Sequence, residues 1–303
     1  MRYVNNISYG NLRFAKLFLT ILIIAISFLI TGQPASAATV SKQKGLTLSP
    51  LRTEMNIAPG TAQNGELKVT NNSTKPMVVT MSSEAFSVIN QQYDYAFTAE
   101  SNEVNWVSFN HPEVDLGPEE SEIVTYTVGV PLSAEPGGRY LSVFASTDSG
   151  LISNGVESRQ RVASLFYITV LGDVSRVGHL VSLSSPWFIT GDSTWNTSLQ
   201  NTGSTHYRSR YSLQIKDLII DRTVASMSGE SLVLPDTIRL IPNKLPAPFW
   251  PGVYKAVYNI GLGDNPAVTK TQLILYMPVW ATIIVVIAVT IIASWLINKY
   301  KKT

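Results

Sequence analysis

The chain has 303 residues, no cysteine, three histidines and a formal net charge of +2. Disulfides and thiolate metal sites are therefore excluded, and few histidines are left for a metal-dependent enzyme. Residues 38–272 carry all 21 acidic residues against 17 Lys and Arg, whereas residues 1–37 and 273–303 each carry three basic residues and no acid. A mildly acidic middle gives no electrostatic basis for nucleic-acid binding, so we predict none.

The first apolar run, Leu17–Ile30, predicts a secretory signal peptide. Three basic residues precede it, and its 14 residues would span only about 21 Å as a helix, which is too short for a bilayer core. The small residues Ala35-Ser36-Ala37 then supply a cleavage site. We expect residues 1–37 to form a signal peptide that is cleaved before Ala38. An uncleaved anchor is the alternative.

The middle of the chain predicts an all-β fold. Short runs of β-branched and aromatic residues are separated by Gly, Pro, Asn and Ser, and Val124, Tyr126 and Val128 alternate with polar residues as in a half-buried strand. We expect Trp195, inside such a run, to lie in the core. Strands are predicted at 67–70, 77–83, 123–130, 140–146, 161–171, 195–200, 211–215 and 254–260.

Two motifs recur along the chain and predict two modules. The run LKVTNNS at 67–73 has a counterpart, TSLQNTG, at 197–203, and in both an Asn and small polar residues mark a turn. Pro136-Gly137 with Tyr140 is likewise matched by Pro251-Gly252 with Tyr254. We therefore predict two tandem immunoglobulin-like β-sandwiches, at 46–171 and 177–272, each able to fold alone.

The second apolar run, Leu273–Ile297, predicts a transmembrane helix. Its 25 residues carry no charge and would span about 37 Å, and aromatic residues lie near both boundaries. Lysines follow at once, so the positive-inside rule makes residues 298–303 a cytoplasmic tail and places the sandwiches outside the cell. We expect a single-pass protein of the cell membrane. A buried core helix is the alternative.

The sequence contains no recognisable catalytic or metal-binding pattern. His111, His179 and His206 have no partner at metal-ligand spacing, and neither an HExxH nor a GxSxG motif occurs. Glu119-Glu120 with Glu122 could hold a cation, but a solvated turn is the simpler interpretation. We predict a protein that is not an enzyme and needs no cofactor or metal.

Aromatic residues are the remaining candidates for binding. Tyr93 and Tyr95 lie in a polar stretch, and Trp187 and Trp250 adjoin prolines and so lie near turns. Tyr and Trp are enriched at binding hot spots. We therefore predict Tyr93, Tyr95, Trp187 and Trp250 as binding residues, with burial in a sandwich core as the alternative. Exposed strand edges could also accept a partner strand.

The order of several motifs resembles that of the WxL-interacting cell-surface proteins, whose N-terminal domain is of the DUF916 type. The motifs are Leu48-Ser49-Pro50, Ile57–Gly60, Leu67–Asn71 and Pro136–Tyr140 in the first module, and Leu199–Gly203, Leu234-Pro235 and Trp250–Tyr254 in the second. The first module lacks the usual start of that family, and residues 85–122 do not match it. The resemblance implies peptidoglycan binding by the first domain and partner-protein binding by the second. A more distant likeness is to the sandwich of pilus chaperones.

These features together predict a membrane-anchored bacterial cell-surface protein for binding, adhesion or scaffolding. Its expected partners are a cell-wall polymer such as peptidoglycan, envelope or host proteins, or both. Two alternatives stay open. One is an accessory subunit of a membrane complex, assembled through Leu273–Ile297. The other is a cell-envelope enzyme whose site the sequence does not reveal.

Overall fold

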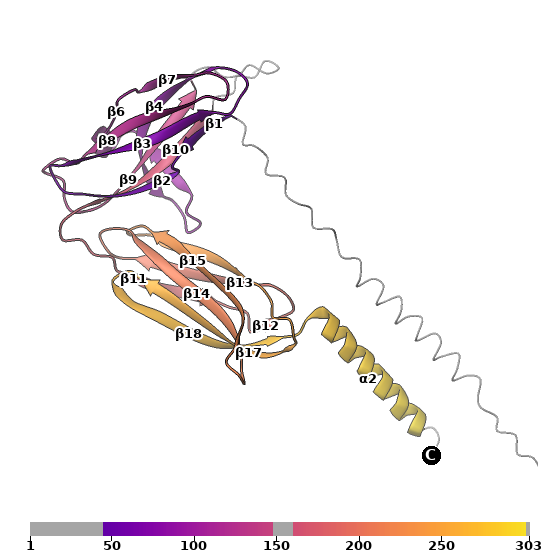
Figure 1. The fold of residues 1–303 in the computed structure, drawn as a ribbon. Coiled ribbons are helices and arrows are strands. Elements are labelled where there is room, and N and C mark those ends of the chain that lie inside the picture. Colours follow the sequence, from indigo (N-terminus) through magenta and orange to yellow (C-terminus); the bar gives the residue numbers. More distant parts are fainter. Residues whose placement is uncertain (1–44, 148–159, 301–303) are drawn as a thin grey trace, which may run out of the picture. The chain divides into compact units, whose positions relative to one another are not determined.

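The computed structural model describes residues 45–147 and 160–300. Within them the chain forms two β-sandwiches followed by one helix, which confirms the predicted all-β fold with a C-terminal helix (Figure 1). The expected signal peptide at 1–37 lies outside the described residues, as does the end of the expected tail.

The first sandwich packs a four-stranded sheet against a six-stranded sheet. The smaller sheet has the order β1 (Leu46–Ser49), β3 (Ala62–Asn71), β8 (Ser121–Gly129), β6 (Val107–Phe109). The larger has the order β2 (Arg52–Ile57), β10 (Arg161–Val170), β9 (Gly137–Thr147), β4 (Met77–Val88), β5 (Tyr95–Thr98), and β7 (Glu113–Leu116) also pairs with β4. A short 3₁₀ helix, η1 (Asn102–Trp106), precedes β6. Only β2 and β10 pair in parallel among these strands.

The second sandwich packs a three-stranded sheet against a five-stranded sheet. The smaller sheet has the order β11 (Gly178–Ser184), β13 (Ser193–Asn201), β16 (Ile238–Leu245). The larger has the order β12 (Phe188–Ile189), β18 (Asn265–Tyr276), β17 (Gly252–Leu262), β14 (Tyr207–Asp217), β15 (Thr223–Val233). Trp195 is buried in the core of this sandwich, as its place in the sequence predicted.

Strand alternation positions the cores. In β8, Val124, Tyr126 and Val128 are buried between the sheets, while the residues between them face outwards in part. In β9, Leu141 and Val143 are buried on one face and Ser142 on the other, so this strand is covered on both sides. The polar and apolar periodicity of the sequence therefore predicted the inner faces correctly.

The two repeated Asn motifs form the same local structure. The Asn71 side-chain amide donates to the carbonyls of Lys75 and Gly117, and its oxygen accepts from the Ser73 amide. The Asn201 side chain does the same with the carbonyls of Thr205 and Val233 and with the Gly203 amide. Both asparagines are fully buried. Each therefore replaces water for backbone groups that a tight turn leaves unpaired.

The C-terminal helix, α2 (Val279–Tyr300), starts later than predicted. The residues Leu273–Tyr276 continue β18 and pair with β17, because their side chains alternate between the core and solvent. Pro278 then separates strand from helix and accepts hydrogen bonds from the first helical turn. The start at Leu273 was wrong, since an apolar strand and an apolar helix follow each other without a polar break. Lys299, assigned to the tail, belongs to α2.

Candidate functional site

Tyr93 is buried, contrary to the predicted exposed contact surface. It lies in the turn between β4 and β5 with φ of +69°, and its hydroxyl accepts from the Leu234 amide at 2.9 Å. The same hydroxyl lies 2.6 Å from the Thr237 hydroxyl, and the Arg239 guanidinium stacks 4.3 Å from the ring centroid. Tyr93 thus joins strands of the first sandwich to the segment between β15 and β16, and is not free to bind a ligand.

Tyr95 lies beside this contact and is half-buried. Its ring packs edge-on against Phe86 at 5.2 Å, and its hydroxyl lies 3.4 Å from that of Tyr167. A shared apolar cluster contains Phe86, Tyr93, Leu165, Tyr167, Leu232 and Leu234. The aromatic outer face of the six-stranded sheet is therefore largely occupied by the chain itself.

His206 is buried beside the same aromatic cluster, and we expect its burial to make the stability depend on pH. Its ring packs against Tyr140 and Tyr167, with ring centroids 5.7 Å away in each case. Burial lowers the pKa of His206 from 6.5 to about 4, and it outweighs the negative charge of Glu54, which raises that pKa. Between pH 6.5 and about 4, His206 is therefore protonated in the unfolded chain but neutral in the folded chain.

The free energy of unfolding should fall by up to about 3 kcal/mol as the pH drops from 6.5 to about 4. Urea unfolding of the wild type and of His206→Phe, each at pH 7.5 and 4.5, measures this. The variant should lose clearly less stability than the wild type over that interval. Equal losses would show that His206 does not carry the effect.

Trp187 and Trp250 are exposed, at 70% and 65% of their surface. Trp187 follows β11 and contacts Phe188 with ring centroids 5.8 Å apart. Trp250 precedes β17, packs against Phe249 at 5.0 Å and lies edge-on to Trp280 of α2 at 6.4 Å. The adjacent prolines correctly indicated loops. The structure therefore does not gather the four predicted residues into one site.

The second sandwich has two unpaired strand edges that face each other. β12 covers only Leu275 and Tyr276 of β18, so the outer edge of Asn265–Ile274 has no strand partner within the described residues. β11 pairs with β13 along one edge. Within the described residues no strand pairs with its other edge. Such edges are usually blunted or covered, because they offer free amides and carbonyls.

A groove lies between these edges and is closed at both ends. At one end Val177 bridges Gly263, and the Asn265 side-chain Nδ2 donates to the Gly178 carbonyl at 2.9 Å. At the other end the Ser185 hydroxyl donates to Gln272. The Gln272 side-chain Nε2 in turn donates to the Pro186 carbonyl at 3.1 Å. We call this slot the β11–β18 groove.

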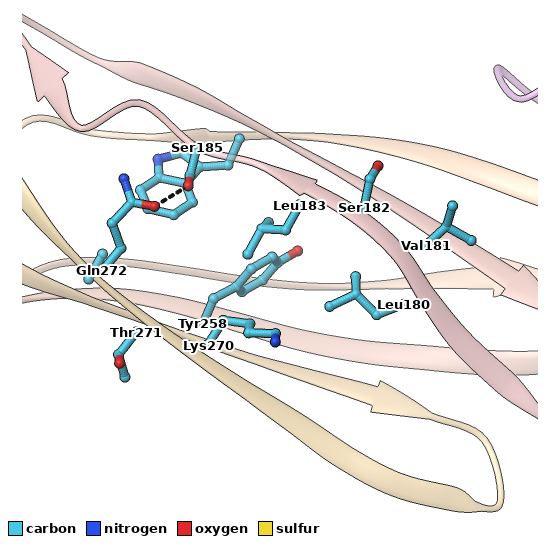
Figure 2. A pocket seen from close by; sticks show the side chains of 11 residues that line it. Leu180, Val181, Ser182, Leu183, Ser185, Tyr258, Lys270, Thr271 and Gln272 are labelled. Carbon is cyan, nitrogen blue, oxygen red and sulfur yellow. Dashed lines mark hydrogen bonds between the residues drawn. The ribbon is translucent and has the colours of Figure 1, made fainter.

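The β11–β18 groove is lined by residues of both edges, Leu180–Leu183 of β11 and Lys270–Gln272 of β18. Figure 2 shows Leu180 and Leu183 of β11 directed towards Tyr258, with Lys270 of β18 beside the same ring. The cavity there has a volume of about 380 Å³, and a second cavity of about 470 Å³ is also lined by Leu180 and Lys270. Trp195 forms part of its floor.

The floor of the groove has polar groups that are already paired. The Tyr258 hydroxyl accepts from the Thr197 hydroxyl at 2.8 Å and from the Asn243 side-chain Nδ2 at 2.9 Å. Burial raises the pKa of Tyr258 to about 12, so its hydroxyl stays protonated at neutral pH. This arrangement suits packing against a ligand and offers no activated nucleophile. Among the described residues no group of three or more His, Asp or Glu could hold a metal ion.

Sequence reasoning missed this groove. Its usable signal was weak: residues 265–272 are mostly polar and exposed, with only Val268 and Gln272 half-buried after Asn265, directly before the apolar run. Edges are set by which strands pair, and pairing joins residues far apart in the sequence. A periodic pattern alone therefore cannot identify them.

Comparison with known proteins gives a fold likeness only. No family model matches the chain, and no curated protein matches its sequence. Similar solved structures include a chain of the chaperone–tip adhesin complex of CFA/I fimbriae biogenesis, with 10% identity over 75% of this chain and 98% of that one, at a TM-score of 0.40. The class 5 fimbriae chaperone CfaA has 11% identity over 77% and 100%, at 0.39. A chain of the CsuC–CsuE pre-assembly complex of Acinetobacter baumannii has 11% over 77% and 99%, at 0.37. These likenesses concern the strand arrangement and assign no function to this chain.

Proposed function

We propose that this chain is a membrane-anchored cell-surface protein that binds an extended polypeptide segment in the β11–β18 groove, without catalysis. The observation that carries the proposal is the pair of unpaired strand edges facing each other across a slot with both polar and apolar side chains. An added strand would satisfy backbone groups on both edges and bury alternate side chains against Leu180, Leu183 and Trp195.

The hydrogen-bonding direction of β18 supports this mode. The amides of Leu275 and Met277 donate outwards, to carbonyls of Trp187 and Ile189. Because amide direction alternates along a strand, those of Thr269, Thr271 and Leu273 face the same outer side. These groups are the ones that a partner strand would use.

The anchoring part of the proposal rests on α2 and the charge pattern. Val279–Ile297 is, within the described residues, the one helical stretch long and apolar enough to cross a membrane. Basic residues follow it and precede the first apolar run, whereas all acids lie between the two runs. By the positive-inside rule both sandwiches are then extracellular and the C-terminus cytoplasmic.

Replacing Thr271 by Pro is expected to weaken peptide binding at least tenfold, about 1.4 kcal/mol, because proline removes an outward amide and fills its place with a ring. An edge strand tolerates proline on its solvent side, so the fold should persist. Fluorescence anisotropy with the full chain in detergent micelles measures the Kd. The probe is a labelled ten-residue peptide that alternates Val and Thr.

The matched control is Thr271→Ala, which changes the same side chain but keeps the amide, and should bind within twofold of the wild type. A second control is a peptide of equal length with Pro at alternate positions, which cannot form a strand. Equal binding by Thr271→Pro and Thr271→Ala, or by both peptides, would refute strand addition in the groove.

Binding of peptidoglycan by the first sandwich is a second candidate, favoured by one observation besides the resemblance to the WxL-interacting proteins. Phe97 of β5 is exposed and packs edge-on against Phe144 at 5.1 Å, and Arg161 stacks over Phe144 at 3.4 Å. The exposed part of the Phe97 ring offers apolar surface for contact with the C–H groups of a sugar. Sedimentation of the full chain with insoluble peptidoglycan, with and without the strand-forming peptide, separates the two candidates.

A further inference from the structure

Three loops of the second sandwich carry large apolar side chains in water. They are Trp187-Phe188, Leu218–Ile220 and Phe249-Trp250, which we call the apolar rim. Ile219 is 92% exposed and Phe249 75% exposed. None of the seven side chains is charged, and soluble surfaces rarely gather so many large apolar residues.

The strand register places all three loops at one end of the sandwich. Phe188 pairs with Leu275, and Gly252, two residues after Trp250, pairs with Tyr276. Asp217, directly before Leu218, pairs with Tyr254, two residues along β17 from the same end. Tyr276 is the last residue of β18, so the apolar rim surrounds the point where the chain leaves the sheet.

The connection from this end to α2 is very short. Only Met277 and Pro278 separate β18 from α2, and the Met277 amide still donates to the Ile189 carbonyl at 3.0 Å. Two residues reach at most about 10 Å from Tyr276 to Val279. The contact between Trp250 and Trp280 further joins the apolar rim to the first turn of α2.

The loop that carries Ile219, the most exposed residue of the apolar rim, is preorganised. The Asp217 carboxylate accepts the amides of Ile219 at 2.9 Å and Ile220 at 3.2 Å, and the Asp217 amide donates to Arg222. These backbone groups are therefore hydrogen-bonded within the turn, while the Ile219 side chain points outwards. A loop that leaves water needs these internal hydrogen bonds, because a backbone group without a partner is costly in lipid.

We infer that the apolar rim enters the interfacial region of the outer lipid leaflet, so that the second sandwich sits directly on the membrane. The inference rests on the membrane anchoring given under the proposed function. A lipid surface is the occupant that the structure favours, because the apolar rim is continuous with the helix that would cross the bilayer. Trp and Phe side chains are also those that settle at such an interface.

The test uses single cysteines, because the chain has none of its own. Full-length Ile219→Cys and Phe249→Cys are labelled with an environment-sensitive dye and placed in phosphatidylcholine nanodiscs, with and without lipids that carry a quencher near the headgroup. The control is Leu132→Cys, equally exposed at 82% but in the first sandwich. We expect quenching of at least twofold at 219 and 249 and none at 132.

The outcomes separate the two proposals. If the full chain fails to enter nanodiscs or to float with vesicles after alkaline extraction, the anchoring fails and the inference falls with it. If the chain is anchored but residues 219 and 249 stay unquenched and accessible to aqueous iodide, the rim inference alone is wrong. Dyes shielded from iodide yet unquenched by lipid would also overturn it, and would point to a protein or a second copy of this chain.

Discussion

Replacing Asn201 by Ala is expected to lower the free energy of unfolding by about 3 kcal/mol. The side chain is fully buried, and its loss leaves the carbonyls of Thr205 and Val233 and the amide of Gly203 without their partners. Each buried polar group left unpaired costs about 1–3 kcal/mol, with partial relief from water that enters the turn. Urea unfolding of the full chain in detergent, followed by tryptophan fluorescence, measures the change.

Asn71→Ala should have a similar cost in the first sandwich, since Asn71 makes the matching hydrogen bonds. The control is Asn72→Ala, because Asn72 is only partly buried and its side chain makes a single bond, 3.1 Å to the Thr47 hydroxyl. It should cost less than about 1 kcal/mol. If Asn72→Ala proves as costly as Asn71→Ala, the special role of the buried asparagine is refuted.

Replacing Tyr93 by Ala is expected to lower the free energy of unfolding by about 3 kcal/mol and to broaden or split the transition. The substitution removes a buried ring and leaves the Leu234 amide without its acceptor. Because Tyr93 belongs to one sandwich and Leu234 to the other, this loss falls on the contact between them. Urea unfolding of the full chain, read by circular dichroism and by fluorescence, reports whether the two signals still change together.

Tyr93→Phe is the matched variant, since it keeps the ring under Arg239 and removes only the hydroxyl. It should cost about 1–2 kcal/mol and preserve a single transition. We proposed that the modules at 46–171 and 177–272 can each fold alone. A single, unbroadened transition in Tyr93→Ala would argue against two separable modules and for one larger cooperative unit.

Much of the fold was accessible from local pattern. The predicted strands around Val124, Leu141 and Trp195 are strands in the structure, because the alternation of apolar and polar residues reports which face is buried. The Asn motifs indicated turns because Asn bonds its own backbone nearby. Less regular strands were missed. β16 contains Pro242, and its position at a sheet edge explains why proline is tolerated there.

The candidate sites were less accessible, since they depend on contacts between distant parts of the chain. Tyr93 looked like an exposed loop residue because its partner Thr237 lies 144 positions away. Trp187 and Trp250 were placed correctly near turns, since adjacent prolines are a local signal. No local signal could say that both lie beside the start of α2, because that follows from the pairing of β12, β17 and β18.

The short connection between β18 and α2 also decides how the second sandwich bears load. The chain enters this sandwich at Val177, which bridges Gly263 at one end, and leaves it after Tyr276 at the other. Tension between these points therefore runs along the strands. It pulls β18 lengthwise against β17, to which β18 is paired from Gly252↔Tyr276 to Leu262↔Asn265. Loading in shear strains these hydrogen bonds together, whereas peeling would break them one at a time, so the sandwich is built to resist a pull between Val177 and the start of α2.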